Sequence, residues 1–139
     1  MKTILLEGTE LSGKTTLVKS ISNALSTNGH KVCTNDGPIY KNSRLVQFPL
    51  LAASSFKSSS LKELMYTFSL LADKRPDKIP EYEGVDYFIQ ERAFPSIIAF
   101  SKVFNKWGIN KLLWKPLSCM YTHFDFNFAL KASPEERYA

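Results

Sequence analysis

The chain has 139 residues, of which 44% are hydrophobic and 22% are charged, so it has the size and composition of about one globular domain and not of a disordered chain. Eighteen Lys and Arg residues against thirteen Asp and Glu residues give a net charge of +5, which suits an anionic small ligand but is too diffuse to indicate a nucleic-acid partner. The two cysteines, Cys33 and Cys119, exclude a disulfide framework. The apolar runs are too short for a signal peptide or a membrane span, so we expect a cytoplasmic protein.

The first part of the chain predicts a strand, a loop, a helix and a second strand. Residues 3–6 are an apolar run typical of a buried strand, and a Gly-containing loop follows. From Lys14 onwards apolar residues recur at helical spacing until Asn28 and Gly29 provide a helix stop. Residues 31–34 predict the second strand, which an Asp-Gly-Pro turn follows.

The rest of the chain continues this alternation. The predicted elements are a polar connection over residues 54–60, a helix over 61–71, a strand over 85–90, a helix over 97–107 and a strand over 124–130. Strands that alternate with helices indicate βαβ units and a parallel sheet. Residues 133–136 (Ser-Pro-Glu-Glu) have the form of a helix start, yet only three residues follow, so we expect the chain to be a fragment.

A phosphate-binding pattern lies between the first strand and the first helix. Residues 8–15 (Gly-Thr-Glu-Leu-Ser-Gly-Lys-Thr) match G-x-x-x-x-G-K-[ST]. Glycines let successive backbone N–H groups face one anion, and the helix N-terminus adds a partial positive charge. We expect Lys14 to reach the terminal phosphates of a nucleotide and the Thr15 hydroxyl to help hold Mg²⁺.

Glu91 and Arg92 follow directly on the third predicted strand. The carboxyl ends of parallel strands border the ligand crevice, where a carboxylate can hold Mg²⁺ and an arginine can bind phosphate oxygens. The alternative is a surface ion pair at a strand end. The phosphate loop in the same chain favours the functional interpretation.

Four stretches, in chain order, have the form of known kinase motifs. Residues 7–16 resemble E-G-x-[DE]-G-x-G-K-[ST]-T, with Leu11 in place of a usual Gly, and residues 71–75 resemble F-A-A-D-R. Residues 91–101 resemble D-R-Y-x-x-S-x-x-A-Y-Q, and residues 128–136 resemble the next strand with its L-D-V-x-P-E-E continuation. The chain therefore resembles the thymidylate kinase and deoxynucleoside kinase group of P-loop kinases.

The resemblance implies roles for the matching residues. The catalytic residues would be Lys14, Glu91 and Arg92, and Mg²⁺ would be held by Thr15 and Glu91. ATP would lie on Gly8, Thr9, Glu10, Leu11, Ser12, Gly13, Lys14, Thr15 and Thr16. The acceptor would be bound by Glu10 through its sugar 3′-hydroxyl, by Arg92 through phosphate, by Lys74 or Arg75 near the base, and by Phe100 if that ring is not simple core.

Departures from the family motifs leave the acceptor open. Ser101 stands where the family has the glutamine that reads the thymine edge, and Glu91 in place of Asp is closer to the deoxynucleoside kinases. In those kinases an acidic residue after the second strand takes the proton of the 5′-hydroxyl, and Asp36 is the candidate here. A monophosphate acceptor is already an anion and needs no such base.

These observations predict a single-domain α/β P-loop NTPase fold over residues 1–139, with a doubly wound parallel sheet flanked by helices and lacking its last strand. The predicted function is transfer of the γ-phosphoryl group of ATP, with Mg²⁺, to a deoxynucleoside monophosphate such as dTMP. The alternatives are a deoxynucleoside kinase and a non-catalytic nucleotide-binding module. The expected partner is a small nucleotide, with a homodimer as an option and neither nucleic acid nor membrane. The family's lid would follow residue 139, so we expect this chain to bind phosphate but to turn over poorly, if at all.

Overall fold

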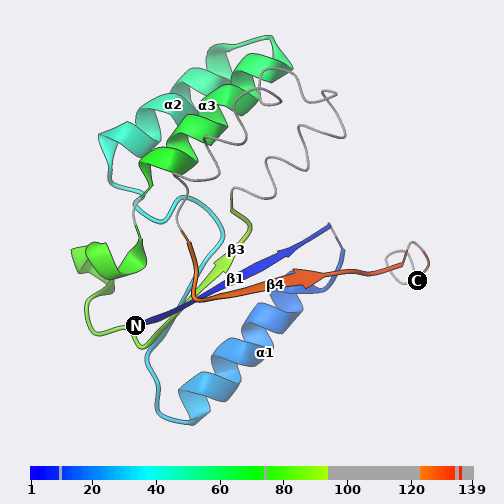
Figure 1. The fold of residues 1–139 in the computed structure, drawn as a ribbon, viewed down its shortest axis with the longest axis vertical. Coiled ribbons are helices and arrows are strands. Elements are labelled where there is room, and N and C mark those ends of the chain that lie inside the picture. Colours follow the sequence, from blue (N-terminus) through cyan, green and yellow to red (C-terminus); the bar gives the residue numbers. More distant parts are fainter. Residues whose placement is uncertain (10, 74, 94–122, 134, 136–139) are drawn as a thin grey trace. The chain divides into compact units, whose positions relative to one another are not determined.

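The computed structural model describes residues 1–9, 11–73, 75–93, 123–133 and 135 (Figure 1). The chain forms two compact units. The first contains Met1–Gly37, Pro76–Ala93 and Phe124–Ala139, and the second contains Pro38–Arg75 and Phe94–His123. No helix within the described ranges is both long and apolar enough to cross a membrane.

A parallel sheet of four strands forms the first unit (Figure 1). The strands are β1 (Lys2–Gly8), β2 (Val32–Asn35), β3 (Tyr87–Glu91) and β4 (Phe126–Leu130), in the order β2-β3-β1-β4. All three pairings are parallel, which confirms the predicted sheet. The phosphate-loop strand β1 lies between β3 and β4, so the carboxyl ends of three neighbouring strands meet beside that loop.

Helix α1 (Lys14–Thr27) covers one face of this sheet and builds its core. Ile4, Leu6 and Ile89 are buried against Val18, because residues two apart on a strand share a face. Leu17, Ile21 and Leu25 of the helix pack around this cluster at the spacing that predicted the helix. Each fully buried side chain of this kind stabilises the fold by roughly 1.5–3 kcal/mol.

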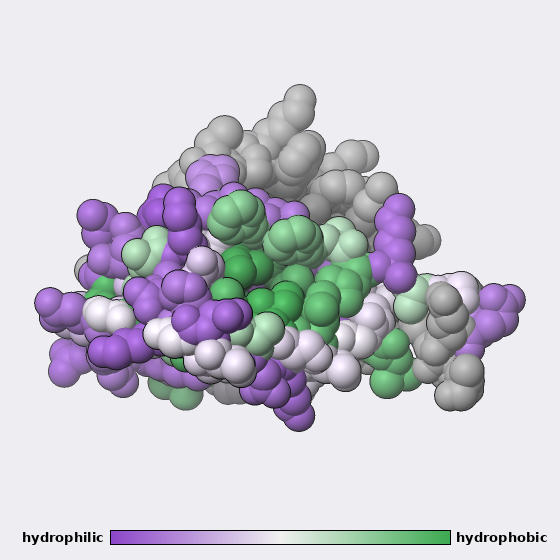
Figure 2. All heavy atoms as spheres, turned by 90° about the horizontal axis from the view of Figure 1, so that it is seen from below, coloured by the Kyte–Doolittle hydropathy of each residue, from purple (hydrophilic) through white to green (hydrophobic). Residues whose placement is uncertain are grey.

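The β4 part of this face is less covered. The register pairs Phe126 with Ile4 and Phe128 with Leu6, which places both rings on the α1 side of the sheet. Phe126 and Phe128 remain 47% and 52% exposed. Figure 2, which is seen from the side on which α1 lies in Figure 1, shows hydrophobic side chains open to the surface among hydrophilic ones.

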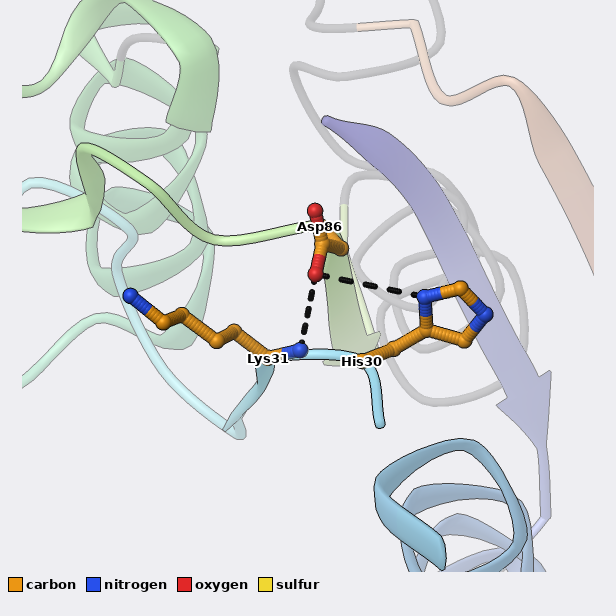
Figure 3. A network of polar contacts seen from close by, with 3 residues as sticks. All are labelled: His30, Lys31 and Asp86. Atoms are coloured by element: carbon orange, nitrogen blue, oxygen red, sulfur yellow. Dashed lines mark hydrogen bonds and ion pairs between the residues drawn. The ribbon is translucent and has the colours of Figure 1, made fainter. Parts of the chain in front are cut away.

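Two aspartates fix the starts of the strands. Asp125 Oδ2 accepts hydrogen bonds from the Thr3 backbone N–H at 2.8 Å and from the Thr3 hydroxyl at 2.9 Å, so β4 begins after Asp125 and not at residue 124 as predicted. Asp86 Oδ2 accepts from the Lys31 backbone N–H at 2.8 Å and lies 3.9 Å from Nδ1 of His30 (Figure 3). Both contacts lie at the amino ends of the strands, which leaves the carboxyl ends for the site.

Helices α2 (Arg44–Ser55) and α3 (Ser59–Ala72) pack against each other in the second unit (Figure 1). Helix α3 confirms the predicted helix over 61–71, whereas the polar connection predicted over 54–60 is wrong, because only three residues separate the helices. The serines there serve the helix ends: the Ser54 hydroxyl donates to Leu51 O, and Ser58 O accepts from the Lys62 N–H.

Three polar contacts hold the second unit together. The buried Ser69 hydroxyl of α3 donates to the backbone oxygen of Val46 in α2 at 2.8 Å. The carboxylate of Asp73 accepts from the backbone N–H groups of Ile39 and Tyr40, the latter at 2.7 Å. The helix predicted over 97–107 lies outside the described residues.

Candidate functional site

The loop between β1 and α1 contains two glycines with positive φ. Gly8 has φ +155° and Gly13 has φ +81°, and the Gly13 carbonyl accepts the N–H of Leu17 at the start of α1. A Cβ on Gly8 would lie 2.7 Å from Leu130 O and 2.8 Å from the Ser12 hydroxyl. Only glycine fits at position 8, because the end of β4 closes against the loop there.

Leu11 adopts φ +57° and is 66% exposed. A left-handed conformation costs a non-Gly residue about 1–2 kcal/mol. The related kinase motif usually has Gly at this position, and the geometry gives the physical reason. The departure noted in the sequence therefore leaves the loop conformation in place and adds strain to it.

Lys14 is buried, with 5% of the residue exposed, and its ammonium group contacts this loop. Its Nζ donates to Gly8 O at 2.9 Å, to Thr9 O, and to the Ser12 hydroxyl at 3.3 Å. These contacts occupy three donors of an ammonium group. The loop thus surrounds a positive charge at the N-terminal end of α1, where the helix dipole favours an anion.

Thr15 and Glu91 are in contact although they belong to different elements. The Thr15 hydroxyl in the first turn of α1 donates to Glu91 Oε2 at the end of β3 across 3.1 Å. The parallel register sets this contact, because it places Glu91 opposite Leu6 near the end of β1. A hydroxyl and a carboxylate oxygen side by side fit Mg²⁺, which uses few protein oxygens together with phosphates and waters.

No group of three or more His, Cys, Asp or Glu side chains that could hold a metal ion occurs in the described part of the chain. The Thr15–Glu91 pair places one hydroxyl and one carboxylate oxygen side by side. A magnesium ion held by one carboxylate and by nucleotide phosphates needs no larger protein cluster.

Arg92 lies in a turn that the neighbouring strand holds. It has φ +59°, a left-handed conformation, and its backbone N–H donates to Leu6 O at 3.0 Å. The next N–H, of Ala93, donates to Glu7 Oε1 at 2.8 Å. The chain therefore turns away from the sheet directly after Glu91, with its backbone fixed to β1 on both sides of Arg92.

Two buried amides beside this turn were not singled out by the sequence analysis. Gln90 Nε2 lies 3.0 Å from Gly37 O, 3.1 Å from Glu91 O and 3.0 Å from Arg92 O. Gln90 Oε1 accepts from Asn35 Nδ2 at 2.9 Å, and the same Nδ2 donates to Gly37 O at 2.7 Å. The signal available in the sequence was a glutamine at the end of an apolar strand.

The remaining predicted residues are distributed as follows. Thr9 and Thr16 are exposed in the loop and in the first turn of α1, and Asp36 is exposed directly after β2. Arg75 is exposed in the second unit. Glu10, Lys74 and Phe100 lie outside the described residues. The first unit thus unites Lys14, Thr15, Glu91 and Arg92 around one loop and one strand end.

Solved structures of known proteins are similar to the fold of this chain. No protein-family model matches the chain, and no curated protein matches it. Among solved structures, the thymidylate kinase from Ehrlichia chaffeensis is similar with a TM-score of 0.58 and 22% identity, over 99% of this chain and 76% of that one. The thymidylate kinase from Candida albicans is similar with a TM-score of 0.64 and 23% identity, over 99% of this chain and 65% of that one. The chain has a thymidylate kinase-like α/β P-loop NTPase fold.

Proposed function

We propose that the chain is a nucleoside monophosphate kinase, which transfers the γ-phosphoryl group of ATP to a deoxynucleoside monophosphate, with dTMP as the first candidate. The observation that carries the proposal is the loop of residues 8–15, which surrounds the Lys14 ammonium and ends at the Thr15–Glu91 contact. A thymidylate kinase-like fold supports it. Since the chain spans 76% and 65% of the two similar kinases, their reaction is carried over as a proposal.

The ATP phosphates would bind at the loop. There the backbone N–H groups and the N-terminal end of α1 favour an anion. The Lys14 ammonium would exchange its contacts with the oxygens of Gly8, Thr9 and Ser12 for phosphate oxygens. A phosphate offers the ammonium a stronger, charge-assisted hydrogen bond than the neutral oxygens of Gly8, Thr9 and Ser12 do.

Thr15 and Glu91 are the residues that would hold Mg²⁺. When bound, Mg²⁺ would neutralise charge on the β- and γ-phosphates. The Thr15–Glu91 contact keeps both oxygen donors at the end of β3 before the ion arrives. Arg92, the next residue, would bind the acceptor phosphate or the transferred phosphoryl group through its planar guanidinium.

The acceptor would bind through residues that the family motifs assign. Glu10 would contact the sugar, Lys74 or Arg75 the base, and Phe100 would pack on the base. The similar Candida albicans enzyme is described as having broad substrate specificity. Ser101 in place of a glutamine therefore makes a panel of acceptor bases the appropriate substrate set.

A deoxynucleoside kinase is the second candidate function. The observation that favours it is Asp36, an exposed carboxylate directly after β2, at the carboxyl edge of the sheet. A neutral 5′-hydroxyl needs a base to take its proton, and a carboxylate at this edge is such a base. A monophosphate acceptor gives Asp36 no role of this kind.

Transfer from γ-labelled ATP to dTMP, to the other deoxynucleoside monophosphates and to thymidine tests the proposal. The purified chain is incubated with Mg²⁺, and the products are separated. We expect a low rate of dTDP formation, with Lys14→Ala as the inactive control. Phosphorylation of thymidine but not of dTMP would overturn the monophosphate acceptor, and ATP binding without any transfer would favour the non-catalytic module.

We also propose that the protein dimerises through α2. Leu45, Phe48 and Leu51 are 74%, 73% and 68% exposed. Their spacing of three places them within about one third of the helix circumference. In a two-fold interface the same patch of both copies meets, so one apolar face on α2 would be covered by its own copy. Sedimentation should give a dimer for the native chain and a monomer for Phe48→Glu, and a native monomer would contradict this proposal.

A further inference from the structure

We propose that Gln90 is a positioning residue that sets the backbone of Glu91 and Arg92, and with it the placement of the Mg²⁺ and phosphate ligands. This inference rests on the proposed function. Gln90 itself is buried at the end of β3, only 2% exposed, so it acts through its neighbours. Its side chain has no role in the family motifs to which the sequence was compared.

The contacts of Gln90 reach both segments that border the site. Its Nε2 carries two hydrogens and faces three backbone oxygens, those of Gly37, Glu91 and Arg92, at 3.0–3.1 Å. Gly37 lies in the loop after β2, whereas Glu91 is the last residue of β3 and Arg92 follows it. One amide group therefore connects the loop after β2, which carries Asp36, with the turn after β3.

The Arg92 turn needs such an anchor. Its left-handed backbone, φ +59°, costs a non-Gly residue about 1–2 kcal/mol. The N–H of Arg92 bonds to Leu6 O and the N–H of Ala93 bonds to Glu7 Oε1, so the donors of the turn are held by β1. Gln90 supplies the complementary part, because it binds the carbonyls of Glu91 and Arg92.

The neighbouring amide of Asn35 orients the Gln90 side chain. The register places Asn35 directly opposite Gln90, and Asn35 Nδ2 donates to Gln90 Oε1 at 2.9 Å. Because Oε1 is used as an acceptor, Nε2 is the end that faces the three carbonyls. A carboxylate at position 90 would present an acceptor to those carbonyls, and an apolar side chain would present nothing.

The consequence for the site follows from chain geometry. Glu91 begins the held turn, and its Oε2 reaches the Thr15 hydroxyl at 3.1 Å. If the carbonyls of Glu91 and Arg92 lose their donor, only the N–H groups of Arg92 and Ala93 still hold the turn, and we expect the carboxylate and the guanidinium to shift with the backbone. Supporting residues of this kind typically change activity or metal affinity by about 10- to 100-fold.

The test compares Gln90→Met, which has nearly the same shape and no donor, with Thr3→Val as a matched control. Thr3 is a buried polar residue of the same sheet, 1% exposed, and its hydroxyl bonds to Asp125 away from the site. Both variants remove hydrogen bonds of a buried side chain, so both should lose stability. Only Gln90→Met should lower kcat, by about 10- to 100-fold, and raise the Mg²⁺ concentration that gives half of the maximal rate. Its Kd for ATP measured without metal should stay within about threefold of the native value.

Backbone amide shifts separate this inference from the proposed function. In nucleotide-free protein, the ¹⁵N–¹H signals of Arg92 and Ala93 should move in Gln90→Met and stay in place in Thr3→Val. If the native chain transfers no phosphoryl group, the proposed function fails, yet these signals still decide the role of Gln90. Unmoved signals, or a Gln90→Met enzyme that loses stability but keeps its kcat, would overturn the inference.

Discussion

The Thr15 hydroxyl and the Glu91 carboxylate meet across 3.1 Å, although 76 residues separate them in the chain. The parallel pairing of β1 with β3 creates this contact, because it brings the end of β3 beside the start of α1. A strand end and a helix start thus supply one oxygen ligand each. A substitution of Glu91 therefore tests the proposed magnesium site.

Glu91→Gln should lower Mg²⁺-dependent activity by about 10- to 100-fold, because an amide is a weaker ligand for a hard cation than a carboxylate. The Kd for ATP measured without Mg²⁺ should change little. Glu91→Asp is the matched control, since it keeps the charge. A Mg²⁺ dependence that stays the same in Glu91→Gln would place the metal elsewhere.

Lys14→Ala should weaken ATP binding by about 10- to 100-fold, because a charge-assisted hydrogen bond contributes about 1.5–3 kcal/mol. Isothermal titration measures the effect directly. Lys19→Ala removes the same charge from an exposed position of α1 and should leave the Kd nearly unchanged. Equal losses in the two variants would mean that ATP responds only to net charge.

Leu11→Gly should raise the free energy of unfolding by up to about 1 kcal/mol, since it removes the left-handed strain at φ +57° and adds a smaller entropy cost. Leu11→Ala keeps a Cβ and should give no gain. Chemical denaturation of the three proteins checks the order. A destabilised Leu11→Gly would show that the leucine side chain contributes packing despite its exposure.

Gly8→Ala should disrupt the loop, because the added Cβ would approach Leu130 O to 2.7 Å. We expect a loss of ATP binding together with a lower unfolding midpoint. Gly29→Ala is the control: its φ of +84° makes the substitution cost about 1–2 kcal/mol, but nothing lies within 4 Å and the position is far along the chain from the loop. ATP binding by Gly29→Ala should stay native. If Gly8→Ala also binds ATP normally, the end of β4 does not close the loop.

The sequence predicted the elements whose patterns are regular. Residues 3–6 and the helix from Lys14 have clean apolar periods, and both appear, as β1 and α1. Pro49 interrupts the helical pattern of α2, because proline has no N–H to continue the helix hydrogen bonds. The serines at the C-terminal end of α2 and the N-terminal end of α3 have the composition of a polar loop. Helix α2 was therefore not predicted, and its C-terminal end was taken for a loop.

The sequence motifs predicted part of the candidate site. Spacing alone marked Lys14 and Thr15, and the place of Glu91 at a strand end marked the second ligand. Gln90 and Asn35 could not be found in this way, because their pairing depends on the register of β2 against β3, which no local pattern states. The strain at Leu11 likewise became visible only with the backbone angles.

The most direct test of the account is a titration of ATP with Mg²⁺ against ¹⁵N-labelled native chain. We expect the backbone amide signals of residues 8–15 to shift together and saturably, with the same titration of Lys14→Ala requiring about 10- to 100-fold more ATP. Shifts that avoid this loop, or that are equal in the native chain and in Lys14→Ala, would contradict a nucleotide site between β1 and α1.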